Sequence, residues 1–403
     1  MLKRIDYTRA RDILLSQPAA HFPERVPLES ALDRVLARNI YATLPVPSFD
    51  KSPFDGFAFR AADVPGTLAI DGEASAGVEE LPPLRPGTAM RIFTGAPIPG
   101  GADAVVKAED TESSDGKVRI SRSFAPNTNI IKAGETLAPG SLVAKAGTIL
   151  SPAHLGTLAS QGRGSVSVYK KPRAVLINTG SEIVSPGQPC PKYSIYNSSA
   201  YSLSGYLRHM GLDVTNAGIV PDEKQRICKA VAEALASDAD IVLTTGGASV
   251  GSYDFALETA ESIGMEILFW KVNVKPGGAL LAAAKNGKLY LGLSGNPAAA
   301  LMSLLVVIQP YLRKLTGAAV QTEELFLPLR EAFPKTSSIC RMLRGHLLIE
   351  DGRAYFAWHD GQTNGNIASF ANCELIGIIP GSAGPLPAGA VIKVLRLPPD
   401  ICR

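Results

Sequence analysis

Three turns in the middle of the chain have the residue types that bind anions through backbone N–H groups. Each follows an apolar, strand-like run, and the turns are Thr179-Gly180, Gly246-Gly247 and Gly295-Asn296. In open α/β sheets, ligands bind at the carboxyl ends of the strands, because backbone N–H groups and helix N-termini converge there. The three turns therefore predict an anion or nucleotide cleft.

The last two turns carry most of the predicted substrate contacts. Asn296 and Pro297 have the types of an N-cap and a first helical residue, although an ordinary strand-to-helix turn has the same pattern. The run T-G-G-A-S-V-G over 245–251 can form an anion nest, and it is not the G-x-G-x-x-G fingerprint of nicotinamide enzymes. The expected substrate-binding residues of these turns are Gly246, Gly247, Ser249, Gly295, Asn296 and Pro297.

Three acidic residues lie close to the predicted strand ends: Glu182, Asp222 and Asp254. Carboxylates in such positions can hold a Mg²⁺ that bridges phosphate groups. Each of them taken singly is more often a solvated loop acid or a helix cap. Together they form the predicted metal site.

Two lysines, Lys271 and Lys275, lie four residues apart in W-K-V-N-V-K-P-G. On a single strand, the period of two places both ammonium groups on one face, which suits an oxyanion or a phosphate. The alternative is a pair of lysines that protects a sheet edge from aggregation.

Loop-dense segments nearer the N-terminus carry a second set of polar and acidic residues: Asp55, Thr94, Asp103 and Glu109. Asp55-Gly56 alone would be a turn. The 5 histidines stand in unrelated contexts and the chain has no G-x-S-x-G, so hydrolysis by a Ser-His-Asp triad is disfavoured.

The elements that must position these residues change in type along the 403-residue chain. Apolar residues at helical spacing predict helices near 10–14 and 28–36. Short strand-like runs from Phe57 to about Leu142 predict a β-rich lobe, and a helix capped by Ser151 follows them. That helix could return to pack with the N-terminal helices, which would make the lobe an insertion.

After residue 172, long apolar runs alternate with helical patterns, as expected for a parallel sheet covered by helices. Short strands and turns return from about residue 323. The predicted parts are a helical linker domain (1–45 with 140–171), the β-rich lobe (46–139), a doubly wound α/β domain (172–320) and a C-terminal β domain (321–403).

Composition argues against several classes of protein. The 40 Lys and Arg and 37 Asp and Glu give a net charge of +3 without long runs of one sign, so the footprint of a nucleic-acid binder is missing. The longest apolar stretch, 298–308, is about half a bilayer crossing, and the N-terminus lacks the apolar core of a secretion signal. The 5 cysteines include no C-x-x-C pair, so we expect a cytoplasmic protein without disulfides, a zinc site or a membrane partner.

Taken in order, the motifs resemble those of the molybdopterin molybdenumtransferase family, which includes MoeA and the gephyrin E domain. They are S-P-F-D-G-F-A, R-I-F-T-G-A-P-I-P-G-G-A-D, V-L-I-N-T-G-S-E, T-T-G-G-A-S-V-G-S-Y-D, W-K-V-N-V-K-P-G and G-L-S-G-N-P. The resemblance implies an α/β multi-domain chain with a central doubly wound, MogA-like domain. An inserted β-rich lobe, a helical linker domain and a C-terminal small β-barrel domain complete the implied fold.

The resemblance also implies an enzyme that inserts molybdate into adenylylated molybdopterin and releases AMP, with Mg²⁺ assisting. It implies a homodimer whose active site lies between the α/β domain of one subunit and the lobe and C-terminal domain of the other. A molybdopterin adenylyltransferase is a further expected partner. By motif position, the implied catalytic residues are Asp55, Thr94, Asp254, Lys271 and Lys275, the metal ligands are Glu182, Asp222 and Asp254, and two further substrate contacts are Arg344 and Ser369.

The chain departs from the family pattern beside the implied oxyanion pocket. Gly278 and Ala279 replace a lysine and a proline, Ala299 replaces a serine, and Ser181 and Thr136 replace carboxylates. A lost lysine and a lost hydroxyl remove two donors, each worth roughly 1.5–3 kcal/mol when the contact is charge-assisted. An alternative therefore stays open, a diverged paralogue that binds a pterin nucleotide or serves as a scaffold.

Overall fold

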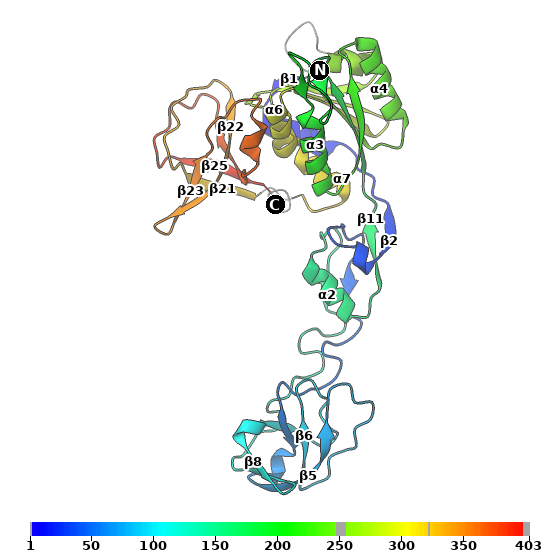
Figure 1. Ribbon diagram of the computed structural model, residues 1–403, viewed down its shortest axis with the longest axis vertical. Helices are drawn as coiled ribbons and strands as arrows, with labels where there is room; N and C mark the ends of the chain where they lie inside the picture. The colour runs from blue at the N-terminus through cyan, green and yellow to red at the C-terminus, as the bar shows by residue number, and fades with distance from the viewer. Residues whose placement is uncertain (1, 247–254, 321–322, 398–403) are drawn as a thin grey trace.

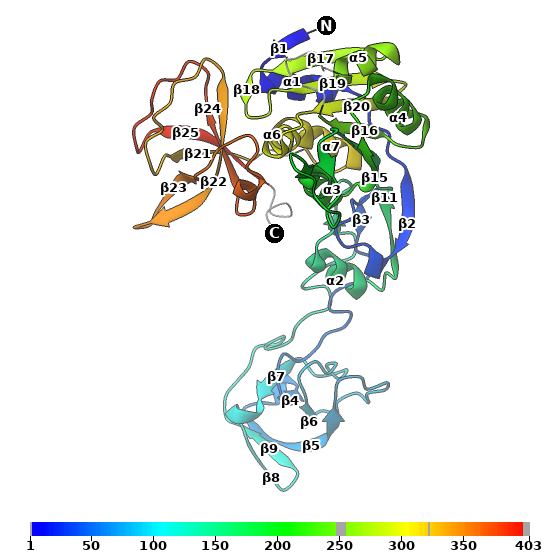
Figure 2. The same ribbon diagram turned by 45° about the horizontal axis from the view of Figure 1, so that its top comes forward.

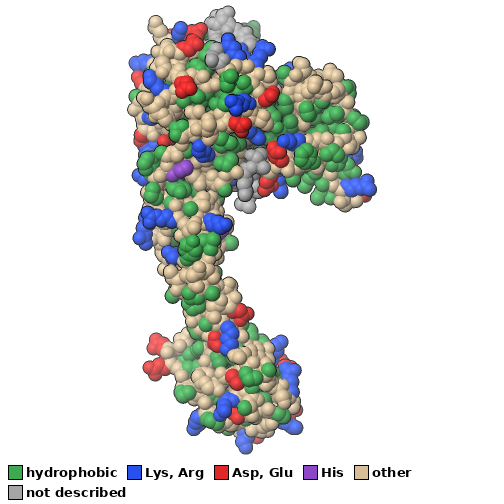
Figure 3. Space-filling view, turned by 180° about the vertical axis from the view of Figure 1, so that it is seen from behind, with side chains coloured by type: hydrophobic (Ala, Val, Ile, Leu, Met, Phe, Trp, Pro, Cys, Tyr) green, Lys and Arg blue, Asp and Glu red, His purple; other side chains and the backbone are tan. Residues whose placement is uncertain are grey.

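The computed structural model describes residues 2–246, 255–320 and 323–397, which form an elongated series of domains. The α/β domain and the C-terminal sheet lie at one end, the β-rich lobe lies at the other, and the linker domain lies between them (Figures 1 and 2). On the face that Figure 3 shows, basic and acidic side chains are interspersed over these domains. The expected multi-domain α/β architecture is confirmed.

A seven-stranded sheet in the order β1-β17-β19-β20-β16-β12-β15 forms the centre of the α/β domain. Its strands are β1 (Leu2–Ile5), β12 (Arg173–Thr179), β15 (Asp213–Val220), β16 (Ile241–Thr245), β17 (Glu266–Val272), β19 (Leu280–Lys285) and β20 (Lys288–Leu293). The sheet is mixed rather than parallel, because β19 is antiparallel to both of its neighbours. Asn286 and Gly287 have φ values of 51° and 77°, so an Asn-Gly hairpin turn reverses the chain between β19 and β20.

Helices cover both faces of this sheet, so the doubly wound prediction holds for it. One apolar cluster joins Leu176, Leu243 and Leu291 to α1 (Tyr7–Ser16), α3 (Ser198–His209) and the helical segment after residue 296. Neighbouring strand residues, Ile177 and Val242 among them, face the opposite way and pack on α4 (Lys224–Ala236) and α5 (Phe255–Ser262). Strand residues alternate between two apolar layers, which explains the long apolar runs in the sequence.

The most apolar helical segment, Pro297–Thr316, comprises α6 (Pro297–Met302), a π-helical turn η4 (Ser303–Ile308) and α7 (Gln309–Thr316). Its length and composition would suit a membrane span, but 89% of its most apolar window is buried inside the protein. It packs in the same cluster as α1 and α3, so it is a core helix of the α/β domain.

The N-terminal segment differs from its prediction in two ways. β1 pairs with β17 and α1 packs on η4 and α7, so residues 2–16 belong to the α/β domain and not to the linker domain expected for 1–45. The second expected helix is wrong, because only a short 3₁₀ turn η1 (Leu28–Ser30) forms there. Val35 and Leu36 instead form bridges to Ile149 and Val168, so tertiary pairing overrides the helical spacing.

The linker domain is built from two segments far apart in the chain. β2 (Pro23–Pro27) pairs with β11 (Ser165–Tyr169), and β3 (Ile40–Tyr41) pairs with β10 (Leu142–Ala144). Helix α2 (Pro152–Ser160) is capped by Ser151, whose side chain accepts a hydrogen bond from the N–H of His154. The two pairings enclose the lobe as an insertion.

The lobe itself is a six-stranded sheet in the order β7-β4-β6-β5-β9-β8. Its elements are β4 (Gly56–Phe59), η2 (Ala61–Asp63), β5 (Gly66–Ala74), β6 (Thr88–Ile92), β7 (Ala104–Lys107), η3 (Ala108–Asp110), β8 (Glu112–Ser114) and β9 (Lys117–Ile120). Two apolar clusters, one on each side of β4, contain only residues of the lobe. The lobe therefore has a core of its own.

The C-terminal domain is a six-stranded sheet that includes a strand from the α/β segment of the chain. Its strands are β18 (Val274–Lys275), β21 (Glu323–Pro328), β22 (Cys340–Glu350), β23 (Arg353–Trp358), β24 (Leu375–Ile379) and β25 (Val391–Arg396). The C-terminal β domain expected from the sequence is present. The closed small barrel stays a prediction, since a single bridge between Leu329 and Phe356 connects the chain after β21 to β23.

Gly317 ends α7 at the junction with the linker domain and should not tolerate a side chain. Its φ is 78°, and a Cβ there would lie 2.4 Å from Cδ2 of Tyr169. Gly287 has a similar φ of 77°, but a Cβ at that position would have nothing within 4 Å, so it is the matched control. We expect Gly287→Ala to cost about 1–2 kcal/mol of backbone strain and Gly317→Ala about 1–3 kcal/mol more from the clash.

Differential scanning calorimetry of both variants checks this expectation through the unfolding transition of the α/β domain. Equal downward shifts for Gly287→Ala and Gly317→Ala would show that Tyr169 moves aside freely.

Candidate functional site

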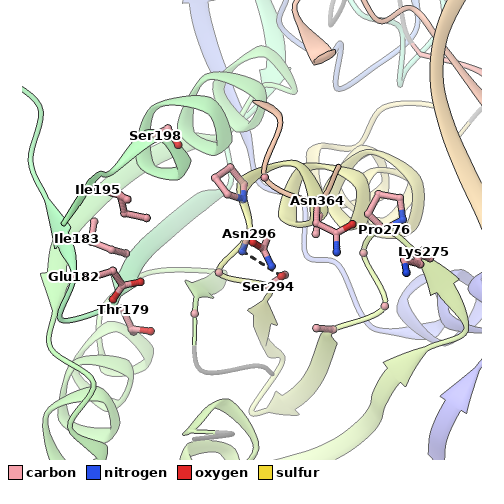
Figure 4. Close-up of a pocket in the computed structure, with 18 of the residues that line it drawn as sticks. Thr179, Glu182, Ile183, Ile195, Ser198, Lys275, Pro276, Ser294, Asn296 and Asn364 are labelled. Carbon is pink, nitrogen blue, oxygen red and sulfur yellow. Dashed lines mark hydrogen bonds between the residues drawn. The ribbon is translucent and has the colours of Figure 1, made fainter. Parts of the chain in front are cut away.

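A cavity of about 760 Å³ opens at the carboxyl ends of β12, β16 and β20. All three predicted turns reach it, through Thr179, Gly246 and the run Gly295, Asn296 and Pro297. Figure 4 shows Thr179 and Glu182 on one side, Lys275 on the opposite side, and Ser294 and Asn296 between them. The convergence that the sequence predicted is therefore present in the fold.

The strand ends approach so closely that one of these turns requires glycine. Gly246 has a φ of 94°, and a Cβ there would lie 2.5 Å from both the carbonyl oxygen and Oγ1 of Thr179. Beneath it, the buried Thr179 hydroxyl donates to the carbonyl of Thr245 at 3.0 Å, and Asn178 Nδ2 donates to Thr245 Oγ1 at 2.7 Å. These bonds fix β12 against β16 under the cavity.

Two of the three predicted metal ligands line the cavity, Glu182 and Asp222. The N–H of Asp222 donates to the Ser181 hydroxyl at 3.3 Å, which places the two acidic segments side by side. Asp254, Gly247 and Ser249 lie outside the described residues. In the described ranges, no group of three or more His, Cys, Asp or Glu side chains could hold a metal by itself.

This donor set nevertheless fits Mg²⁺ that arrives with a phosphate ligand. Mg²⁺ is commonly held by one or two carboxylates together with substrate phosphates and water, rather than by a full protein cage. Glu182 and Asp222 supply that number of hard oxygen ligands on one wall of the cavity.

The two predicted lysines separate. Lys275 lines the cavity, whereas Lys271 is not among its described lining residues and has its ammonium 3.9 Å from the centre of the Trp270 ring. The expectation of one strand with both ammonium groups on one face is wrong. The φ of Lys271 is 70°, β17 ends at Val272, and Lys275 belongs to a strand of another sheet, so the alternation is lost.

Arg344, expected to contact substrate, is fully buried with an exposed fraction of 0% and does not line the cavity in the described structure. Its Nη2 donates to the carbonyl of Thr363 at 3.2 Å, and its backbone exchanges hydrogen bonds with Gln362. Burial lowers the pKa of the guanidinium. Arg344 thus lies under the loop whose next residues, Asn364 and Gly365, do reach the cavity.

Ser369 is likewise not brought to the described cavity. It lies on η5 (Ile367–Phe370) and its hydroxyl donates to the carbonyl of Asn366 at 2.6 Å. Asn364 is the polar side chain that this part of the chain presents, and the sequence analysis missed it (Figure 4). The polar T-N-G-N run was its only signal, and such a run is also typical of any exposed turn.

The acidic wall of the cavity contains further residues that the sequence analysis missed. The segment after Glu182 forms a small parallel pair, β13 (Ile183–Val184) with β14 (Ile195–Tyr196). Ile183, Ile195, Tyr196 and Ser198 of this segment line the cavity. A two-residue strand has too little periodicity to be detected in a sequence.

The three departures noted beside the oxyanion pocket, Gly278, Ala279 and Ala299, all line the cavity. A Cβ at Gly278 would lie 2.7 Å from the carbonyl oxygen of Val274 and 2.8 Å from that of Val272. The surrounding backbone therefore leaves no space for a side chain at Gly278, and a lysine at that position would require the turn to shift.

Asp55 and Thr94 come together in the lobe, although they are far apart in the sequence. Both the backbone N–H and the hydroxyl of Thr94 donate to Asp55 Oδ1 at 2.8 Å. These two bonds, with a smaller contribution from Arg91, hold the pKa of Asp55 below its usual value. The pair is exposed and lies in the domain farthest from the cavity of its own chain (Figures 1 and 2).

Comparison with known proteins agrees with this arrangement. The family described as "MoeA N-terminal region (domain I and II)" matches residues 5–162, and the "Probable molybdopterin binding domain" matches residues 175–314. The molybdopterin molybdenumtransferase of Nostoc is 33% identical over 388 residues, covering 93% of this chain and 89% of the relative. The chain belongs to the molybdopterin molybdenumtransferase family.

Other family members support the same assignment. The molybdopterin molybdenumtransferase of Staphylococcus aureus is 32% identical over 383 residues, covering 93% of this chain and 91% of the relative. The crystal structure of a molybdopterin biosynthesis MoeA protein from Pyrococcus horikoshii superposes with a TM-score of 0.82 at 27% identity, over 98% of this chain and 99% of the other. The likeness therefore covers the lobe and the C-terminal sheet as well as the α/β domain.

The hydrogen bonds between Thr94 and Asp55 predict how the stability of the protein depends on pH. Because the pKa of Asp55 is lowered by folding, its stabilising contribution is present above its usual pKa of about 4 and is lost as the pH falls through the lowered value. Thr94→Val removes one of the two hydrogen bonds, so the pKa of Asp55 should rise part of the way to its usual value. Carboxyl ¹³C NMR over a pH titration measures it.

Thr88→Val serves as the control, since the Thr88 hydroxyl donates to the Arg85 carbonyl in the same lobe. An Asp55 titration that is the same in Thr94→Val as in the unaltered protein would contradict the assigned cause of the shift.

Proposed function

We propose that this protein inserts molybdate into adenylylated molybdopterin and releases AMP, in the cytoplasm. The observation that carries the proposal is the cavity where three glycine-bearing strand ends meet two carboxylates on one side and Lys275 on the other. Such a cavity suits a nucleotide whose phosphates need both backbone donors and charge neutralisation. The names of the relatives, molybdopterin molybdenumtransferases, support the transfer of molybdenum to molybdopterin.

Each group in the cavity has a definite task in this reaction. The backbone N–H of Gly295 binds a phosphate group, and Asn296 adds a side-chain amide. Glu182 and Asp222 hold Mg²⁺, which neutralises charge on the phosphoanhydride when it is bound. Lys275, on the opposite wall, attracts molybdate and orients it toward the pterin. Because the two carboxylates and Lys275 lie on opposite walls, the adenylylated molybdopterin and the molybdate bind at different ends of one cavity.

The alternative of a scaffold paralogue is not favoured. Relatives named as transferases cover 93% of the chain, so the resemblance is not confined to a binding domain. The replaced donors lie around Gly278 and Ala299, whereas the strand-end turns, Glu182, Asp222 and Lys275 are all at the cavity. The departures therefore bear on molybdate affinity rather than on the existence of the site.

The purified chain should release AMP and load molybdenum when it receives adenylylated molybdopterin, Mg²⁺ and molybdate. Glu182→Gln should lower kcat/KM about 10- to 100-fold, the equivalent of losing one charge-assisted contact. Glu266→Gln, an exposed acid at the start of β17 in the same domain, is the matched control. Absence of molybdenum transfer at millimolar molybdate, or an equal loss in both variants, would refute the proposal.

We also propose that two chains form a homodimer in which the Asp55–Thr94 pair of each chain completes the cavity of the other. The pair lies too far from its own cavity to act there (Figure 1). The linker domain and the adjoining chain expose apolar side chains that a partner could cover: Leu32, Tyr41, Leu44, Phe49 and Leu142. A molybdopterin adenylyltransferase is the proposed supplier of the adenylylated substrate.

Mixing two impaired variants tests the composite site. Asp55→Asn and Glu182→Gln should each lose about 10- to 100-fold in activity alone, because each homodimer loses a group from both sites. A heterodimer of the two retains one intact site, so random exchange of subunits should restore about a quarter of the unaltered activity. Activity of the mixture equal to the average of the separate variants would place both residues in a site formed by one chain.

A further inference from the structure

The linker domain contains a cavity of about 250 Å³ that shares no described lining residue with the cavity of the α/β domain. We call it the arginine pocket, because Arg25, Arg38 and Arg163 all line it. Its other described lining residues are uncharged and include no carboxylate. The described part of the pocket therefore carries three positive charges that no acidic side chain in it compensates.

Backbone pairing on both edges of β11 brings these arginines together from distant parts of the chain. On one edge, Arg25 of β2 is the direct partner of Ser167, and its Nε donates to Ser165 Oγ at 2.7 Å. On the other edge, the N–H of Ala37 donates to the carbonyl of Ser167 at 3.0 Å, which places Arg38 beside the same strand. The folded linker domain therefore holds like charges close to one another.

Two of the three arginines have donors without a partner. Arg163 Nη2 donates to the carbonyl of Tyr41 at 3.2 Å, but its Nε is buried and makes no hydrogen bond in the described structure. The Arg38 side chain is exposed and makes no hydrogen bond or ion pair within the described ranges. A buried charged donor that lacks an acceptor costs more free energy than a neutral one, so an acceptor in the pocket would be stabilising.

The uncharged polar groups at the pocket are also available as donors. Ser165 Oγ accepts from Arg25 Nε, which leaves the Ser165 O–H to donate. Asn39 Oδ1 accepts from the N–H of Ala146 at 2.9 Å, and one of the two Nδ2 hydrogens is directed to the Tyr41 hydroxyl at 3.4 Å. The other Nδ2 hydrogen remains free to donate. A ligand of this pocket should therefore be rich in acceptors and carry negative charge.

The apolar residues of the pocket limit the size of that ligand. Leu36, Ile40 and Val166 line the pocket and are buried in the core of the linker domain, so they form a fixed apolar wall. An apolar wall strengthens the interaction between the arginines and an anion, because it excludes water on one side. The volume of about 250 Å³ lies below the roughly 300–1,000 Å³ that is usual for sites of drug-sized ligands. The ligand is therefore small.

We propose that the arginine pocket binds a phosphate group, either as free phosphate or as the end of a small phosphate ester. Guanidinium groups bind phosphate oxygens through paired N–H···O bonds, and a phosphate dianion compensates more of the three charges than one carboxylate does. The bound phosphate would link β2 and β11 to the segment after Ala37, which leads into the lobe. This inference goes beyond the proposed reaction, in which no residue of the arginine pocket takes part.

Isothermal titration calorimetry on the full chain tests the pocket without requiring turnover. Sodium phosphate is titrated into the unaltered protein, Arg38→Gln and Lys170→Gln. Arg38→Gln removes a charge without breaking a described side-chain contact. Lys170 is the matched control, since it is an exposed cation just after β11 and does not line the pocket. We expect Kd for phosphate to rise at least about tenfold in Arg38→Gln and to stay within about twofold in the control.

A variant of the α/β cavity separates the two sites. Lys275 lines that cavity and not the arginine pocket, so Lys275→Gln should retain the phosphate binding that Arg38→Gln loses. Equal losses in Arg38→Gln and Lys275→Gln would place the anion in the cavity and overturn the proposal. Unchanged affinity in Arg38→Gln, or an equal loss in Lys170→Gln, would also overturn it.

A second probe identifies the source of the phosphate group. Glycerol 3-phosphate is titrated into the same proteins. Tighter binding of the ester than of inorganic phosphate, lost in Arg38→Gln, assigns the pocket to the end of a small phosphate ester. Equal or weaker binding of the ester assigns it to free phosphate. Both results support a phosphate pocket.

Thermal unfolding at constant ionic strength provides an independent measurement. Replacing chloride by phosphate should raise the unfolding temperature of the unaltered protein, and this rise should be lost in Arg38→Gln. If molybdenum transfer fails but the rise depends on Arg38, the arginine pocket stands and the proposed reaction falls. If transfer proceeds and the rise is independent of Arg38, the reverse holds. If phosphate causes no rise and Arg38→Gln weakens the dimer in sedimentation velocity, acidic side chains of a second copy fill the pocket and the phosphate proposal falls.

Discussion

Strand β18 pairs with β22 of the C-terminal sheet, although its neighbours in the chain belong to the α/β domain. Val274 on this short strand is buried in one apolar cluster with residues of both domains, Leu293 on one side and Met342 on the other. The α/β domain and the C-terminal domain therefore share a core, and they cannot separate without exposing it. The cavity lies at this junction, so the pairing fixes its opposite walls relative to each other.

The lobe differs in this respect, because its apolar clusters contain no residue of another domain. Its Asp55–Thr94 pair is held locally by two hydrogen bonds and is positioned without help from the cavity. A rigid junction with a separate, outlying lobe is the geometry expected when the lobe serves a neighbouring subunit. With this geometry, the proposed composite site forms only when two chains associate.

Charge is distributed along the junction in a definite order. Glu182 and Asp222 lie on the wall built from β12 and β15, and Lys275 lies on the wall built from β18. Next to Lys275, Arg341 adds a second positive charge as its partner in the β18–β22 ladder. A Cβ at Gly278, which lines the same cavity, would meet the backbone carbonyls of Val272 and Val274.

Much of the α/β domain could be predicted from the sequence, because local patterns determine it. Apolar runs between helical patterns marked β12, β16 and β20, and the glycines that follow them marked the cavity, since only glycine allows a φ of 94° beside Thr179. The Asn286-Gly287 hairpin that makes the sheet mixed is also a local signal, although the alternating pattern around it predicted a parallel sheet.

Other features depended on contacts between distant segments. The apolar spacing near Leu36 is typical of a helix, but Leu36 forms a β-bridge with Val168 instead. The W-K-V-N-V-K-P-G run is divided between two sheets, because Lys275 pairs with Arg341 of the C-terminal sheet. Arg344 matched a family position, but only packing showed that it supports the loop of Asn364 instead of lining the cavity. The sequence by itself determined which backbone turns could bind an anion, since that property belongs to residue types. The tertiary structure alone decided which charged side chains face them, since that depends on which strands lie next to each other.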